Sequence, residues 1–164
     1  MEMTEPTVAD VTRMALTMEE KGENLYSWAA RKFNNQEVVN MFHRLAEEEK
    51  EHAMVFRRLL ELPDARTTIS AESNKYLKML ANPSDIFPTR GEINEDQIKT
   101  PADALSLGIQ AEKDSILFYQ EMYHQTKSPE IKQALSKLLE EEKMHLLALR
   151  DSMEELNHFS TTRR

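Results

Sequence analysis

The chain has 164 residues, a formal net charge of −8 and no cysteine, a length that suits one domain. Its acidic balance argues against a nucleic-acid-binding protein, because gripping phosphate backbones requires clustered lysine and arginine. The lack of cysteine excludes disulfides, thiolate nucleophiles and clusters held by thiolates, so any metal must be bound by oxygen and nitrogen ligands.

Neither a membrane span nor a secretory signal is recognisable in the sequence. No stretch approaches the roughly 18–20 apolar residues of a transmembrane helix. The first ten residues, MEMTEPTVAD, lack the basic and apolar blocks of a secretory signal. We therefore expect a protein of the cytoplasm that has no membrane partner.

Helix-favouring residues dominate the chain, and glycine occurs at only three positions. Helical periodicity and capping residues predict an all-α fold with four long helices. The predicted helices are residues 8–33, 36–61, 101–126 and 129–157. Their predicted N-caps are Thr7, Asn35, Thr100 and Ser128. The first and third caps are each followed three residues later by an aspartate, as in a capping box.

A long connection, residues 63–99, separates the second predicted helix from the third, and residues 71–81 within it are suited to a short helix. A link of this length can run the full height of a bundle. We therefore expect one four-helix bundle, residues 1–164, made of two helical hairpins and a crossover. The sequence leaves open whether the connection crosses its own bundle or exchanges with that of a neighbouring subunit.

The two hairpins repeat each other. When residues 7–62 are aligned with residues 100–155 by a shift of 93 positions, 14 of the 56 pairs are identical and no gap is needed. The identities fall on capping, acidic and ring-bearing residues more than on ordinary core positions. The stretches LAEEEKEH at 45–52 and LLEEEKMH at 138–145 show this most clearly. Such a pattern indicates a duplicated hairpin with a functional site inside it.

Helical geometry shows which acidic residues face the core, because each residue turns about 100° from the one before. In the second helix, Glu49 and His52 lie on one stripe with Phe42, Leu45 and Phe56. The fourth helix repeats this pair, and the first and third helices each carry one glutamate with a tyrosine seven residues later on the same stripe. Their inward-facing polar residues are Glu142 with His145, Glu19 with Tyr26, and Glu112 with Tyr119.

Four buried carboxylates close together would repel one another strongly and lose several kcal/mol of hydration. Metal cations remove both costs. Four carboxylates balance the charge of two divalent ions, and two Glu-x-x-His pairs with two further glutamates match the metal site found in the core of some four-helix bundles. The sequence therefore predicts a centre of two metal ions bound by Glu19, Glu49, His52, Glu112, Glu142 and His145.

Two further Glu-x-x-His pairs should lie away from this centre. Glu121 is about 180° round its helix from Glu112, so we expect it in solvent beside His124. Glu155 and His158 are likewise off the inward stripe.

Other polar and aromatic residues have simpler interpretations. In each triple-glutamate run only the third residue faces inward, so Glu47, Glu48, Glu140 and Glu141 are expected in solvent, as is His43. Trp28 and the methionines are more typical of packing than of redox groups. For Tyr26 and Tyr119 two roles are open, which are plain core packing and hydrogen bonding to a ligand side chain.

The sequence resembles the rubrerythrin branch of the ferritin-like superfamily. The resemblance rests on Met18 and Glu19 with Tyr26, on the LAEEEKEH stretch, and on their counterparts in the second hairpin. It implies that Glu49 and Glu142 bridge two irons and that His52 and His145 bind one iron each. It also implies that Glu19 and Glu112 are terminal ligands.

Two features depart from the rubrerythrin pattern. The cysteine-ligated rubredoxin module of rubrerythrins is missing, so electrons must come from a separate donor protein. The extra carboxylate usual three residues after the ligand of the third helix is replaced by Ser115, whose counterpart in the first hairpin is Gly22. Small residues here would leave open space beside the metals for dioxygen or peroxide.

Three main functions are compatible with these features, and a different oxidation, such as hydroxylation of an organic substrate, is a fourth. The favoured one is a non-haem di-iron oxidoreductase that reduces hydrogen peroxide or dioxygen in oxidative-stress defence. The second is a ferritin-like ferroxidase that binds and stores iron, and the third is a structural protein whose metals only hold the bundle together. Manganese or zinc would also fit the ligands, and resemblance to related bundles suggests a homodimer.

Overall fold

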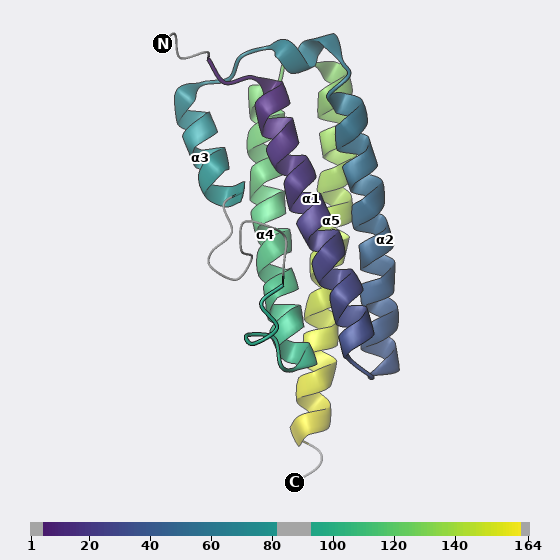
Figure 1. Cartoon of the computed structure of the whole chain (residues 1–164). Helices are drawn as coiled ribbons and strands as arrows, with labels where there is room; N and C mark the ends of the chain where they lie inside the picture. Colours follow the sequence, from purple (N-terminus) through teal and green to yellow (C-terminus); the bar gives the residue numbers. More distant parts are fainter. Residues whose placement is uncertain (1–4, 82–92, 162–164) are drawn as a thin grey trace.

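The computed structural model describes residues 5–81 and 93–161 (Figure 1). The helices are all at predicted places, including the short helix inside the connection, although the last one runs on to Thr161 instead of ending near residue 157. The elements are α1 (Val8–Lys32), α2 (Gln36–Leu59), the 3-10 turn η1 (Pro63–Arg66), α3 (Ala71–Ala81), α4 (Pro101–Gln125) and α5 (Pro129–Thr161). The all-α prediction is confirmed.

Side-chain caps begin the four long helices as expected. The Thr7 hydroxyl accepts from the Asp10 amide at 3.3 Å while the Asp10 carboxylate accepts from the Thr7 amide at 2.9 Å. Thr100 and Asp103 form the same reciprocal pair, at 3.2 and 2.9 Å, which satisfies amides that the first helical turn leaves free. The remaining two caps are Asn35, bonded to Val38 N at 3.1 Å, and Ser128, bonded to Ile131 N at 3.4 Å.

The four long helices form two antiparallel hairpins that pack side by side (Figure 1). The first hairpin consists of α1 and α2 and the second of α4 and α5, with α1 beside α4 and α2 beside α5. After α2 the chain returns along the bundle before α4 begins, so α2 and α4 run in the same direction. This is the crossover topology that the long connection predicts, and it places α3 against α1 and α4 of its own chain.

The connection is tied to the bundle at both of its described ends. Near its start, Ile69 N donates to the carbonyl of Pro6 at 2.8 Å. Near its end, the half-buried Trp28 donates from Nε1 to Glu95 Oε1 at 3.0 Å. The Trp28 side chain thus packs and anchors the returning chain.

One expectation for this region is wrong. Glu121 does not stand free in solvent, since it is half-buried and accepts a hydrogen bond from the Ser73 hydroxyl at 2.6 Å. The reason is that α3 covers this face of α4, which helical periodicity alone does not reveal.

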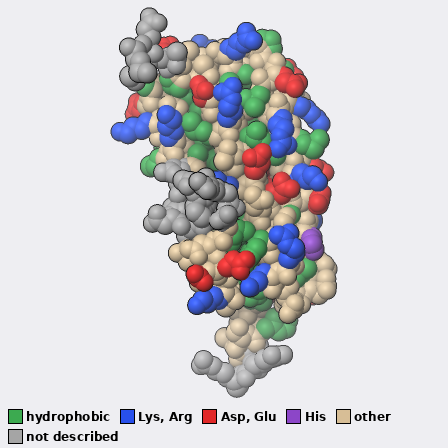
Figure 2. Space-filling model, viewed as in Figure 1, with side chains coloured by type: hydrophobic (Ala, Val, Ile, Leu, Met, Phe, Trp, Pro, Cys, Tyr) green, Lys and Arg blue, Asp and Glu red, His purple; other side chains and the backbone are tan. Residues whose placement is uncertain are grey.

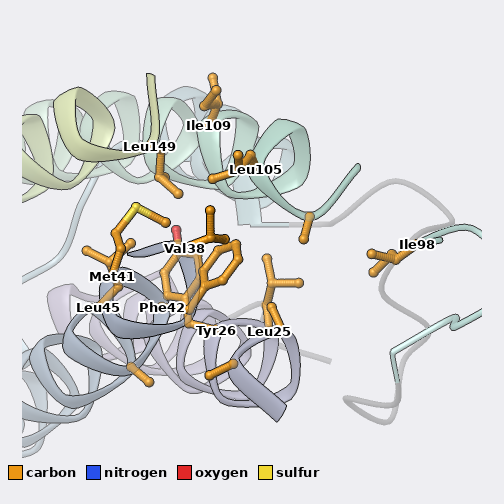
Figure 3. Close-up of a cluster of buried hydrophobic side chains, with 14 residues drawn as sticks. Leu25, Tyr26, Val38, Met41, Phe42, Leu45, Ile98, Leu105, Ile109 and Leu149 are labelled. Atoms are coloured by element: carbon orange, nitrogen blue, oxygen red, sulfur yellow. The ribbon is translucent and has the colours of Figure 1, made fainter. Parts of the chain in front are cut away.

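The apolar core consists of two clusters, one toward each end of the bundle. Figure 3 shows the first cluster, where Tyr26 and Leu25 from α1 meet Phe42 of α2 and side chains of α4 and α5. The second cluster includes Phe56 and Tyr119. The polar residues predicted for the metal centre lie on the same helix stripes between the two clusters, and they are nearly inaccessible to water.

Charged side chains of both signs are interspersed on the face shown in Figure 2. Such mixing is typical of a solvated helical surface and offers no continuous basic stripe for nucleic acid on this face. Within residues 5–81 and 93–161, no helix is both long and apolar enough to cross a membrane.

Candidate metal centre

Six acidic and imidazole side chains meet at mid-height in the bundle. Each long helix brings one glutamate inward, and α2 and α5 each add a histidine one turn later. This is the set that the sequence predicts. Their exposed fractions are 2 % for Glu19, 3 % for Glu49, 3 % for His52, 2 % for Glu112, 0 % for Glu142 and 2 % for His145.

The two Glu-x-x-His pairs form the middle of this cluster. Glu49, His52, Glu142 and His145 each offer one ligand atom, and these atoms all lie within 4.8 Å of one another. His52 Nδ1 is 3.2 Å from Glu49 Oε2 and 3.1 Å from Glu142 Oε1. His145 Nδ1 is 3.4 Å from Glu49 Oε1 and 3.2 Å from Glu142 Oε2. This buried group can bind a metal ion.

The remaining two glutamates flank the group on opposite sides. Glu19 Oε2 lies 3.5 Å from His52 Nδ1, and Glu112 Oε1 lies 3.7 Å from His145 Nδ1. The internal duplication is therefore visible in the geometry, because each half of the centre has one histidine and one flanking glutamate while Glu49 and Glu142 lie close to both halves.

Two buried tyrosines hold the flanking carboxylates in a crossed pattern. Tyr26 of α1 donates its hydroxyl to Glu112 of α4, and Tyr119 of α4 donates to Glu19 of α1. Burial, together with the nearby carboxylates, raises the pKa of both tyrosines well above the usual value, so both hydroxyls keep their protons. Of the two roles that the sequence left open, the structure shows hydrogen bonding to a glutamate of the centre.

In the metal-free cluster, burial and mutual repulsion disfavour the charged forms of the two central carboxyls. Burial, followed by repulsion from Glu142 and Glu19, raises the pKa of Glu49 well above normal. Burial also comes first in raising the pKa of Glu142, ahead of repulsion from Glu112. The raised pKa values favour the neutral carboxyls when no cation is present.

Two buried atoms of the cluster lack a hydrogen-bond partner within the described parts of the chain, which is evidence for a metal site. Among the described residues, Glu142 Oε2 and His145 Nδ1 are buried and have no hydrogen-bond partner, although they lie 3.2 Å apart. Buried polar atoms rarely remain unsatisfied. A carboxylate oxygen and an imidazole nitrogen that face the same small space are the donors that a cation such as iron, manganese or zinc would satisfy.

The structure adds two residues that sequence reasoning placed in solvent. Glu48 Oε2 lies 2.6 Å from His145 Nε2, and Glu141 Oε2 lies 3.0 Å from His52 Nε2. The expectation for these glutamates is wrong because each reaches a histidine of the opposite hairpin, which a helical wheel of one helix does not show. Their identity in both repeats was the available signal.

The other outward-facing residues are where they were expected. Glu47 and Glu140 are exposed, as is Glu155. The three further histidines, His43, His124 and His158, are also at the surface.

A small cavity lies between α1, α3 and α4. It has a volume of about 60 Å³ and is lined by Gly22 and Ser115, among others, with Leu80 and Ala81 of α3 at its edge. A Cβ atom at Gly22 would lie 3.5 Å from the carboxylate of Glu49. Gly22 thus lines the cavity and also lies next to the carboxylate of Glu49.

Comparisons with known proteins agree with this description. The family model for rubrerythrin matches residues 10–153. A candidate ferritin-like di-iron-carboxylate protein from Thermotoga maritima superimposes with a TM-score of 0.75 at 26 % identity, over 92 % of this chain and 97 % of that one. A hypothetical protein from Pyrococcus furiosus gives a TM-score of 0.69 at 22 % identity, over 96 % and 95 %. No curated protein matches the sequence. The chain therefore belongs to the rubrerythrin family, within the ferritin-like di-iron-carboxylate fold.

Proposed function

We propose that the protein is a non-haem di-iron oxidoreductase that reduces hydrogen peroxide, or dioxygen, as part of oxidative-stress defence. The observation that carries this proposal is the buried cluster of four carboxylates and two imidazoles, with unpartnered ligand atoms at Glu142 and His145. Four carboxylates neutralise two divalent cations, and the oxygen and nitrogen donors suit iron.

The duplicated geometry suggests which residues hold each ion. His52 and Glu19 would bind one iron, and His145 and Glu112 the other. Glu49 and Glu142, which lie close to both histidines, would bind both ions. Two iron ions held there would supply the two electrons that cleave an O–O bond, each iron passing from ferrous to ferric.

The surrounding side chains control what reaches the centre. Reduction of one hydrogen peroxide molecule to two water molecules consumes two electrons and two protons, and only a small oxidant fits a cavity of about 60 Å³. The apolar clusters on either side keep bulk water away from the carboxylates. Tyr26 and Tyr119 hold the flanking glutamates, and the carboxylate of Glu49 lies next to Gly22, one of the residues that line the cavity.

Partners belong to the same proposal. The 164 residues contain no cysteine and hence no thiolate-bound electron carrier. We propose that a separate donor protein supplies the electrons, as expected from the sequence. A homodimer in the cytoplasm remains our proposal for its assembly and location.

The test compares substitutions inside and outside the centre. Glu49→Ala and Glu142→Ala are loaded anaerobically with ferrous iron, beside the controls Glu47→Ala and Glu140→Ala, which alter exposed residues of the same runs. Peroxide consumption is followed with an artificial reductant. We expect the two inner variants to fall to the rate of metal-free protein and the controls to match the wild type.

Two outcomes would overturn the proposal. One is peroxide consumption that survives both inner substitutions, because the centre would then not be the catalyst. The other is slow turnover by wild-type protein that instead retains ferric iron far in excess of two ions per chain, inside a particle much larger than a dimer. That result would identify an iron-storage protein.

A further inference from the structure

The two nitrogens of each histidine in the centre face opposite directions. His52 Nδ1 points to the glutamates of the centre, with Glu142 Oε1 at 3.1 Å. On the other side of the ring, His52 Nε2 lies 3.0 Å from Glu141 Oε2. The imidazole, whose side chain is only 4 % exposed, therefore links the centre to a glutamate of α5 that is 41 % exposed.

The second histidine repeats this arrangement. His145 Nδ1 faces Glu142 Oε2 at 3.2 Å, while His145 Nε2 lies 2.6 Å from Glu48 Oε2. The pairs cross between hairpins, because Glu48 of α2 contacts the histidine of α5 and Glu141 of α5 contacts the histidine of α2. Each pair thus also fastens α2 to α5 across the bundle.

A cation lies beside each outer carboxylate. Arg44 Nε is 3.9 Å from Glu48 Oε1, and Lys137 Nζ is 3.7 Å from Glu141 Oε1. Arg44 and Lys137 occupy equivalent positions in the two repeats. In both pairs one carboxylate oxygen faces the imidazole and the other faces the cation, which fixes the orientation of the carboxylate.

These pairs lie at the solvent side of the centre. A cavity of about 510 Å³ between α2 and α5 is lined by His52, Glu48 and Glu141, among others. The imidazoles have no other polar support on this side among the contacts of the described residues. Loss of the contact with Glu141 would therefore leave the His52 ring free to rotate toward this cavity.

We infer that Glu48 and Glu141 are positioning residues that hold the two histidines ready for metal. A carboxylate next to Nε2 accepts the N–H of that atom, and this leaves the lone pair of Nδ1 directed at the centre. The same hydrogen bond increases the basicity of the imidazole, which favours the ferric state over the ferrous state. The inference rests on the proposed metal centre and does not depend on which oxidant it reduces.

The test replaces each outer carboxylate by an amide of the same shape. Glu48→Gln and Glu141→Gln are compared with the controls Glu47→Gln and Glu140→Gln, which change the charge of the protein equally at exposed positions. Anaerobic binding of ferrous iron is measured by competition with a chromophoric chelator, and the midpoint potential is measured by redox titration.

We expect iron affinity to fall by about 10- to 100-fold in the two outer variants, as is usual when a hydrogen-bond partner of a metal-bound histidine is lost. The midpoint potential should rise in the same variants, an effect that a purely structural role would not cause. Both controls should stay within about twofold of wild-type affinity. Glu48→Asp and Glu141→Asp, which keep the charge, should recover part of the loss and also serve if an amide variant does not fold.

Equal iron affinity and potential in the outer variants and their controls would overturn the inference. So would wild-type protein that binds no iron, and in that case the proposed function falls as well. If wild-type protein binds iron, shows the expected differences and yet does not reduce peroxide or dioxygen, only the proposed function fails.

Discussion

Replacing Tyr26 by phenylalanine should measure what the crossed tyrosine bonds contribute to stability. The change removes one hydroxyl and leaves a fully buried ring that stacks on Phe42 at a centroid distance of 5.9 Å. Glu112, which is 2 % exposed, loses a hydrogen-bond donor. Burial alone would raise the pKa of this carboxyl, but Glu142, His145 and the Tyr26 hydroxyl together lower it to about 2. A hydrogen bond to a charged group contributes about 1.5–3 kcal/mol.

We therefore expect the free energy of unfolding of metal-free protein at pH 7 to fall by about 2 kcal/mol, equivalent to about 4–8 °C in Tm for a domain of this size. Urea unfolding followed by circular dichroism measures the change. Tyr119→Phe, its counterpart in the second repeat, should cost about as much. The half-buried Tyr123, whose ring receives Lys132 Nζ at 4.9 Å, provides a control, because Tyr123→Phe keeps that ring contact. A loss no larger for Tyr26→Phe than for Tyr123→Phe would refute the reasoning.

Two more predictions concern pH and the glycines. Burial alone would lower the pKa of His52 and His145. The carboxylates around them outweigh it in metal-free protein and raise both pKa values far above normal, with the largest single contribution from Glu142 at His52 and from Glu112 at His145. The stability they contribute is complete below about pH 6.5 and is lost as pH rises, by up to roughly 1.4 kcal/mol per pH unit for each histidine. In metal-free protein the urea midpoint should fall as the pH is raised from 6 to 9. A midpoint that does not change with pH would contradict this prediction. Gly22→Ala should stabilise by about 1 kcal/mol, since its Cβ makes ordinary contacts at 3.5 Å. Gly108→Ala should not stabilise the protein, because its Cβ would lie 3.1 Å from Leu149 and Tyr26. If urea unfolding showed the same gain in free energy of unfolding for both variants, this packing argument would be wrong.

Some of the centre could be predicted from one sequence because its signals are local and repeated. A glutamate and a histidine three residues apart share a helix face whatever the helix packs against. Glu49 and Glu142 stood out from the neighbouring glutamates of each run because they share the inward helix stripe with His52 and His145. The tight cluster that these two residues form with His52 and His145 is the arrangement expected from their stripes.

Contacts between helices were harder to foresee. The bond from Tyr26 to Glu112 joins residues 86 positions apart, and the contact between His145 and Glu48 spans 97 positions. Both depend on how the hairpins are rotated against each other. A glutamate at the edge of a stripe is solvated or bonded according to the neighbour that faces it, and a sequence pattern within one helix does not identify that neighbour.

The sequence by itself determined the helices, their caps and the identity of the inward-facing carboxylates and imidazoles, because propensity, capping and periodicity act over a few residues. Only the tertiary structure decided that the tyrosine bonds cross between α1 and α4, that Glu48 and Glu141 support the histidines, and that α3 covers Glu121. These features arise where separate helices meet, and their geometry is set by packing of the whole bundle.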